Sequence, residues 1–113
     1  MGYEVLYTNE DGDTYSANNH EQGGTSIKVG DPRTEMGVTS NYSRVYRKHK
    51  FHITDLHGLT GQESMWRMRR IVKDLGTETS DNSWEPTNGN AGHVLNILLG
   101  WAKENPQGFF TVY

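Results

Sequence analysis

The sequence predicts an α+β fold in a single domain, residues 1–113. It consists of a small antiparallel or mixed sheet of about four to five strands with two main helices, at about 61–75 and 91–104, packed on one face. Alternation of apolar and polar residues dominates the first part of the chain, and helical periodicity dominates the second. Because strands precede helices rather than alternating with them, α+β is favoured over α/β. A chain of 113 residues also suits one domain.

Period-two patterns and apolar runs define the strands. Asp11-Gly12 is a turn signal that would join the first two strands as a hairpin. The last segment is so apolar that we expect it inside the sheet. The candidate strands are residues 3–8, 14–17, 25–29, 35–40 and 108–113.

The helix at 61–75 has the clearest signals. Thr60 and Glu63 form a capping box at its start, and Gly76 occupies the position where a helix often ends in a left-handed residue. Arg67, Arg70 and Lys73 fall outside its apolar stripe. That stripe consists of Met65, Met68, Ile71, Val72 and Leu75.

Two further helices are predicted, one before it and one after it in the sequence. The segment 91–104 is strongly apolar, with Asn88 or Asn90 as its cap and Pro106 beyond its end, so we expect it to be the central core helix. Residues 43–50 have helical spacing and predict a short helix, although the same residues could extend a strand.

Composition restricts the class of protein. Only 33% of residues are apolar and the mean hydropathy is -0.81, so the core is thin and we expect a homo-oligomer or a domain completed by a partner. Without cysteine there is no disulfide and no thiolate metal site. The start lacks a signal-peptide pattern, and the longest apolar segment, 94–102, is too short to span a bilayer. We therefore expect a cytoplasmic protein with no membrane partner.

Charge is unevenly distributed along the chain. The net charge is -5 over residues 1–43, +6 over 44–73 and -4 over 74–113. Internal pairing and solvated helix faces account for such a pattern, and so does a local anion site in the basic middle. A strongly basic surface of the kind that binds duplex DNA is not evident.

Four motifs carry a resemblance: Thr39-Ser40-Asn41-Tyr42, Gly58-Leu59-Thr60-Gly61, Trp84–Gly92 and Asn105-Pro106-Gln107-Gly108. With them, roughly residues 35–113 resemble a group of small bacteriophage and prophage proteins whose function is not established. The first third of the chain matches poorly. The resemblance implies a phage-related origin, but it supplies no activity, catalytic residue or cofactor.

Catalytic and metal-binding motifs are weak. No Gly-x-Ser-x-Gly elbow is present, and residues 9–14 lack the spacing and closing Glu of a calcium loop. The histidines match no zinc motif. They are His20, His49, His52, His57 and His93. We therefore predict a protein that is not an enzyme and has no cofactor or metal, although a Ser43, Asp81 and His93 set can be drawn.

The glycine-rich segments before the two main helices carry the site hypothesis. Helix N-termini present free N–H groups that can hold an anion, although ordinary capping explains the same residues. If the two termini converge, they would bind a ligand with two phosphates, with Arg44, Arg47, Lys48 and the exposed arginines of the helix at 61–75 as counter-charges and aromatic residues as stacking surfaces. The predicted ligand-binding residues are Asn41, Tyr42, Tyr46, Arg47, Thr60, Gly61, Trp84, Asn88, Gly89, Asn90 and His93.

Function remains open between three hypotheses. The first is a non-enzymatic phage-type anti-defence protein in the host cytoplasm that sequesters a small anionic, nucleotide-like immune signal. The second is an inhibitor that binds a host defence protein, with the acidic ends of the chain imitating nucleic acid. The third is an enzyme acting on a nucleotide, for which the sequence offers the least support.

Overall fold

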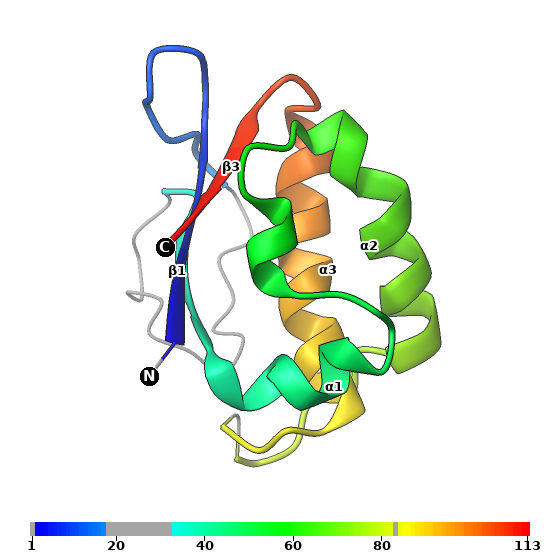
Figure 1. Cartoon of the computed structure of the whole chain (residues 1–113). Helices are drawn as coiled ribbons and strands as arrows, with labels where there is room; N and C mark the ends of the chain where they lie inside the picture. Colours follow the sequence, from blue (N-terminus) through cyan, green and yellow to red (C-terminus); the bar gives the residue numbers. More distant parts are fainter. Residues whose placement is uncertain (1, 18–32, 83) are drawn as a thin grey trace.

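The computed structural model describes residues 2–17, 33–82 and 84–113. Its fold is α+β, with a three-stranded sheet and three α-helices (Figure 1). The elements are β1 (Gly2–Thr8), β2 (Glu35–Thr39), η1 (Ser40–Tyr42), α1 (Ser43–Arg47), η2 (Ile53–Leu56), α2 (Gly61–Leu75), α3 (Asn88–Glu104) and β3 (Phe109–Val112). No helix in these ranges is long and apolar enough to cross a membrane.

The sheet is antiparallel with the order β2-β1-β3, so the expected four to five strands are not found in the described residues. Residues 14–17 contribute only the isolated bridges Thr8↔Thr14 and Ser16↔Arg33, because this segment leaves β1 soon after the turn. The candidate strand at 25–29 lies outside the described residues.

The central strand is β1, not the C-terminal strand as expected. β3 is nevertheless hydrogen-bonded on both sides, which explains its apolar character. Phe110 donates its N–H to the Leu59 carbonyl and accepts from Gly58, while the Val112 N–H is bonded to Nδ1 of His57 at 3.1 Å. The segment 57–60 therefore covers the outer edge of β3.

The helix predictions are confirmed, with small changes at the ends. α2 begins with the predicted capping box: the Glu63 N–H donates to Thr60 Oγ1, and the Thr60 N–H donates to the Glu63 carboxylate. α3 begins at Asn88 and is capped by Thr87 rather than by Asn88 or Asn90, since Thr87 Oγ1 accepts the Asn90 N–H.

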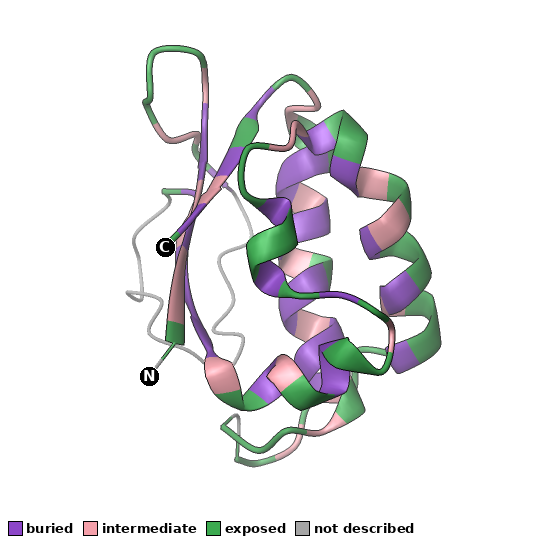
Figure 2. Ribbon diagram, viewed as in Figure 1, coloured by how far each residue is buried: buried purple, intermediate pink, exposed green. Residues whose placement is uncertain are grey.

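The core lies between the helices and one face of the sheet. α3 is buried on most of its surface, whereas α2 is buried on one side and exposed on the other (Figure 2). Val5, Tyr7, Phe110 and Val112 extend from the sheet into this core. The outward side of α2 is therefore exposed.

Candidate functional site

A groove runs between α2 and the turn that follows α1. Its volume is about 450 Å³, and residues from 48–50 form one wall while α2 forms the other. We call it the α1–α2 groove. It is lined by Lys48, His49, Lys50, Trp66, Arg67, Arg70, Ile71 and Asp74.

The α1–α2 groove has an excess of positive charge. Its lining contains four Lys or Arg side chains and a single carboxylate, Asp74, which lies 3.8 Å from Nδ1 of His49. In the described part of the chain, no ion pair neutralises Lys48, Lys50 or Arg70. A concave surface of this composition attracts anions.

Trp66 adds an aromatic surface to the same groove. Its side chain is 63% exposed, an unusually open position for tryptophan. Trp66 directly follows Met65, which belongs to the apolar stripe. Because successive residues of a helix point in different directions, Trp66 points away from that stripe. A ring beside cations is the arrangement that binds a base attached to a phosphate. Sequence reasoning missed Trp66, although its position outside the stripe was a usable signal.

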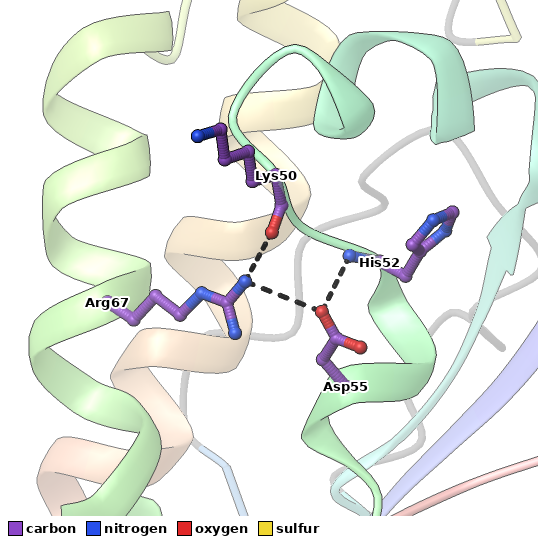
Figure 3. A network of polar contacts seen from close by, with 4 residues as sticks. All are labelled: Lys50, His52, Asp55 and Arg67. Atoms are coloured by element: carbon purple, nitrogen blue, oxygen red, sulfur yellow. Dashed lines mark hydrogen bonds and ion pairs between the residues drawn. The ribbon is translucent and has the colours of Figure 1, made fainter.

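Arg67 holds the two walls of the groove together. Its guanidinium donates to the Lys50 carbonyl and lies 3.5 Å from Asp55 (Figure 3). It also sits 5.1 Å from the centre of the Phe51 ring. Asp55 also accepts the His52 N–H at 3.0 Å. Arg67 therefore has a structural role, whereas Lys48, Lys50 and Arg70 have no ion pair among the described residues.

Lys50 adopts a left-handed conformation, with φ of 54°. The hydrogen bonds around it form a Schellman motif, because Phe51 N–H donates to the Tyr46 carbonyl and Lys50 N–H donates to that of Arg47. Phe51 also packs edge-on against Tyr46. Glycine is the usual residue at this position. Lysine in this conformation lowers stability, and a binding role for its charge would explain why it stands there.

Replacing Lys50 should raise stability and weaken binding. In Lys50→Gly we expect the free energy of unfolding to rise by about 1 kcal/mol, because glycine adopts this conformation without strain. Any affinity of the α1–α2 groove for an anionic probe such as adenosine diphosphate should fall about threefold, because a cation is lost. Urea unfolding and calorimetric titration would measure the two quantities.

Lys48→Gly is the matched control for this prediction. Lys48 has an ordinary helical φ of -62°, so glycine there should lower stability while removing the same charge. If Lys50→Gly lost stability as well, the conformational argument would be wrong.

The predicted anion site at the start of α2 is not available. Gly61 N–H donates to the Gly108 carbonyl, Gln62 N–H to that of Pro106, and Glu63 N–H to Thr60 Oγ1. Hydrogen bonds from Thr60 also hold the pKa of the Glu63 carboxyl below its usual value. The N–H groups that we expected to bind a ligand are used within the protein.

The start of α3 is covered by the chain that follows α2. A Cβ at Gly89 would lie 1.7 Å from the Glu78 carbonyl oxygen, so Gly89 allows close packing rather than ligand contact. Asn90 is buried, and its side chain is bonded to Ser80, Asn82 and Glu85. Asn88, the first residue of the helix, is exposed.

The two helix starts do not converge. The first turn of α2 packs at Gly61 against Ala102, near the end of α3, while Gly92 near the start of α3 packs against Gly76, just after α2. The helices are therefore antiparallel, and their N-termini lie at opposite ends of helices about 20 Å long. A ligand that bridges both termini is excluded by this arrangement.

Tyr42 and Tyr46 belong to the core rather than to a ligand surface. Both are fully buried, and the Tyr46 hydroxyl donates to the Ala91 carbonyl at 2.9 Å. Burial raises the pKa of Tyr42 to about 12 and raises the pKa of Tyr46 well above its usual value. Neither ring is placed to stack on a ligand.

The remaining predicted residues divide between two places. Asn41 donates its side-chain amide to the Trp84 carbonyl at 2.9 Å, and Arg47 lies near Asn41 at a second hollow on the surface. His93 lines a different depression, beside Asn96 on α3. The structure thus brings Asn41, Arg47 and Trp84 together and leaves His93 apart.

Comparison of the chain with protein-family models, curated proteins and solved structures found no match. Within the described ranges, no group of three or more His, Cys, Asp or Glu side chains is arranged to hold a metal ion.

Proposed function

We propose that the protein binds a small nucleotide-like anion in the α1–α2 groove and holds it without converting it. The observation that carries this proposal is the exposed Trp66 next to three cations that no described carboxylate neutralises. Phosphates would lie against Lys48, Lys50 and Arg70, and the base would stack on the indole.

The biological role that fits such binding is sequestration of a nucleotide immune signal, in a phage-type anti-defence protein of the host cytoplasm. Sequestration needs affinity and no chemistry, which suits a groove of cations and one aromatic ring. Native mass spectrometry of protein purified from phage-infected bacteria would identify a bound signal by its mass.

A direct test compares two neighbouring arginines on α2. Arg70 lines the α1–α2 groove, whereas Arg69 is exposed and does not. With adenosine diphosphate as the probe, Arg70→Gln should weaken binding about tenfold, because a charge-assisted hydrogen bond is lost. Arg69→Gln should change binding less than twofold, a shift of about 0.4 kcal/mol.

The readouts are quenching of tryptophan fluorescence and calorimetric titration. Trp66→Ala should abolish the quenching that nucleotide binding causes and weaken the binding itself. Equal effects of Arg69→Gln and Arg70→Gln would place the ligand elsewhere. Release of a product from the probe during incubation would refute the non-enzymatic part of the proposal.

A second candidate is the inhibitor that binds a basic defence protein. One observation favours it: Glu10, Asp11 and Asp13 are exposed on the turn after β1, which projects from the body of the fold (Figure 1). Two backbone N–H groups of this turn are bonded to Asn9 Oδ1, so its shape is defined. Absence of nucleotide binding in the test above would favour this candidate.

A further inference from the structure

A second hollow lies on the other side of α1. Its volume is about 400 Å³, and its lining comes from η1, from α1 and from the loop before α3. We call it the α1–loop hollow. It is lined by Ser40, Asn41, Ser43, Arg44, Arg47 and Pro86.

The hollow is lined by a pair of cations, and an exposed tryptophan lies close to its lining residues in the chain. Arg44 and Arg47 are exposed, and no ion pair with either exists among the described residues. Trp84, two residues before Pro86, is 54% exposed. Spaced three apart on α1, the two arginines share one face.

The backbone of Trp84 is held next to a residue that lines the hollow. Asn41, which lines the hollow, donates to the Trp84 carbonyl at 2.9 Å, and the Trp84 N–H donates to Asn82 Oδ1 at 3.1 Å. Asn82 is bonded in turn to the buried side chain of Asn90. The segment that carries this indole is therefore anchored to both η1 and α3.

The two sites are neighbours because their lining residues adjoin in the chain at the end of α1. Arg47 lines the α1–loop hollow and the next residue, Lys48, lines the α1–α2 groove. Consecutive Cα atoms lie about 3.8 Å apart, so the cations of the two sites follow one another along the chain at the end of α1. One phosphate cannot contact all of these cations, whereas successive phosphates of a chain can.

We propose that the α1–α2 groove and the α1–loop hollow form one bipartite site for a short single-stranded oligonucleotide. This inference rests on the proposed function and specifies its ligand class. The phosphates follow the cations around α1, while one base stacks on Trp66 and another on Trp84. A duplex does not fit this mode, because its bases are already stacked on one another.

Tryptophan variants report on each half of the site. Trp66→Phe leaves Trp84 as the exposed fluorophore, Trp84→Phe leaves Trp66, and the third tryptophan, Trp101, is only 3% exposed in either case. Thymidine monophosphate should quench Trp66 in Trp84→Phe and leave Trp84 unquenched in Trp66→Phe. Oligothymidylates of increasing length should quench both and bind about tenfold tighter than the monophosphate.

Salt dependence tests the phosphate path. For single strands the slope of log affinity against log salt changes by about 0.7 for each phosphate contact. Arg44→Gln with Arg47→Gln should therefore reduce the slope for the oligothymidylate by about 1.4 and leave monophosphate binding unchanged. Arg69→Gln again serves as the control.

The outcomes separate the two proposals. Binding of monophosphate at Trp66 with no gain from length, or duplex binding as tight as single-strand binding, would overturn the bipartite site and leave the proposed function intact. No quenching of Trp66 by any nucleotide would overturn both.

Discussion

Gly92→Ala should lower the free energy of unfolding by about 3 kcal/mol, at the upper end of the range for overpacked sites. A Cβ at Gly92 would lie 1.9 Å from the backbone oxygen of Gly76 and 3.0 Å from Cβ of Leu75. The obstacle is backbone at the end of α2, so no side-chain rotation relieves it. Urea unfolding followed by circular dichroism would measure the loss.

Gly100→Ala is the matched control in the same helix. Apart from α3 itself, no described atom lies within 4 Å of a Cβ at Gly100, so alanine should stabilise the protein by about 0.5–1 kcal/mol through helix propensity alone. A stabilising Gly92→Ala would show that α2 and α3 do not approach as closely as the structure has them.

Asn90→Asp should cost about 3 kcal/mol or more. The Asn90 side chain is 2% exposed, and its amide nitrogen donates to Ser80 Oγ and to the carbonyls of Asn82 and Glu85. A carboxylate places an oxygen against these acceptors in a buried position. Chemical unfolding at neutral pH measures the effect, which should shrink as acid protonates the carboxylate.

Asn88→Asp, two residues earlier, should have the opposite sign. Asn88 is exposed in the first turn of α3, where a negative charge interacts favourably with the helix dipole. We expect a gain of about 0.5 kcal/mol. Equal effects of the two substitutions would mean that the bonds from Asn90 to Ser80, Asn82 and Glu85 do not hold this part of the chain in place.

Local sequence signals predicted the helices well. The capping box at Thr60 and Glu63 acts within four residues, so its pattern is readable without the fold. The same is true of the apolar stripe of α2. Strand number and strand order were predicted less well, since pairing depends on contacts between distant segments. The cover that 57–60 provides for β3 is such a contact.

For the candidate site too, the sequence predicted local features but not contacts between distant segments. The sequence located the basic middle of the chain, and Arg47 and Trp84 stay in the bipartite proposal. The sequence could not show that backbone N–H groups at the start of α2 already donate to the carbonyls of Pro106 and Gly108, or that Tyr42 is buried. The glycines before α3 indicated a ligand site, but Gly89 and Gly92 instead allow α3 to pack closely against the chain after α2.

By itself, the sequence determined the α+β class, the two main helices and the excess of positive charge at residues 44–73, because composition, periodicity and capping act over short distances. Only the tertiary structure decided which N–H groups are already used and which cations line a groove. It also showed that Trp66 faces that groove from α2. Those facts depend on the antiparallel packing of α2 against α3 and on the path of the chain from α1 to α2, which bring together residues far apart in sequence.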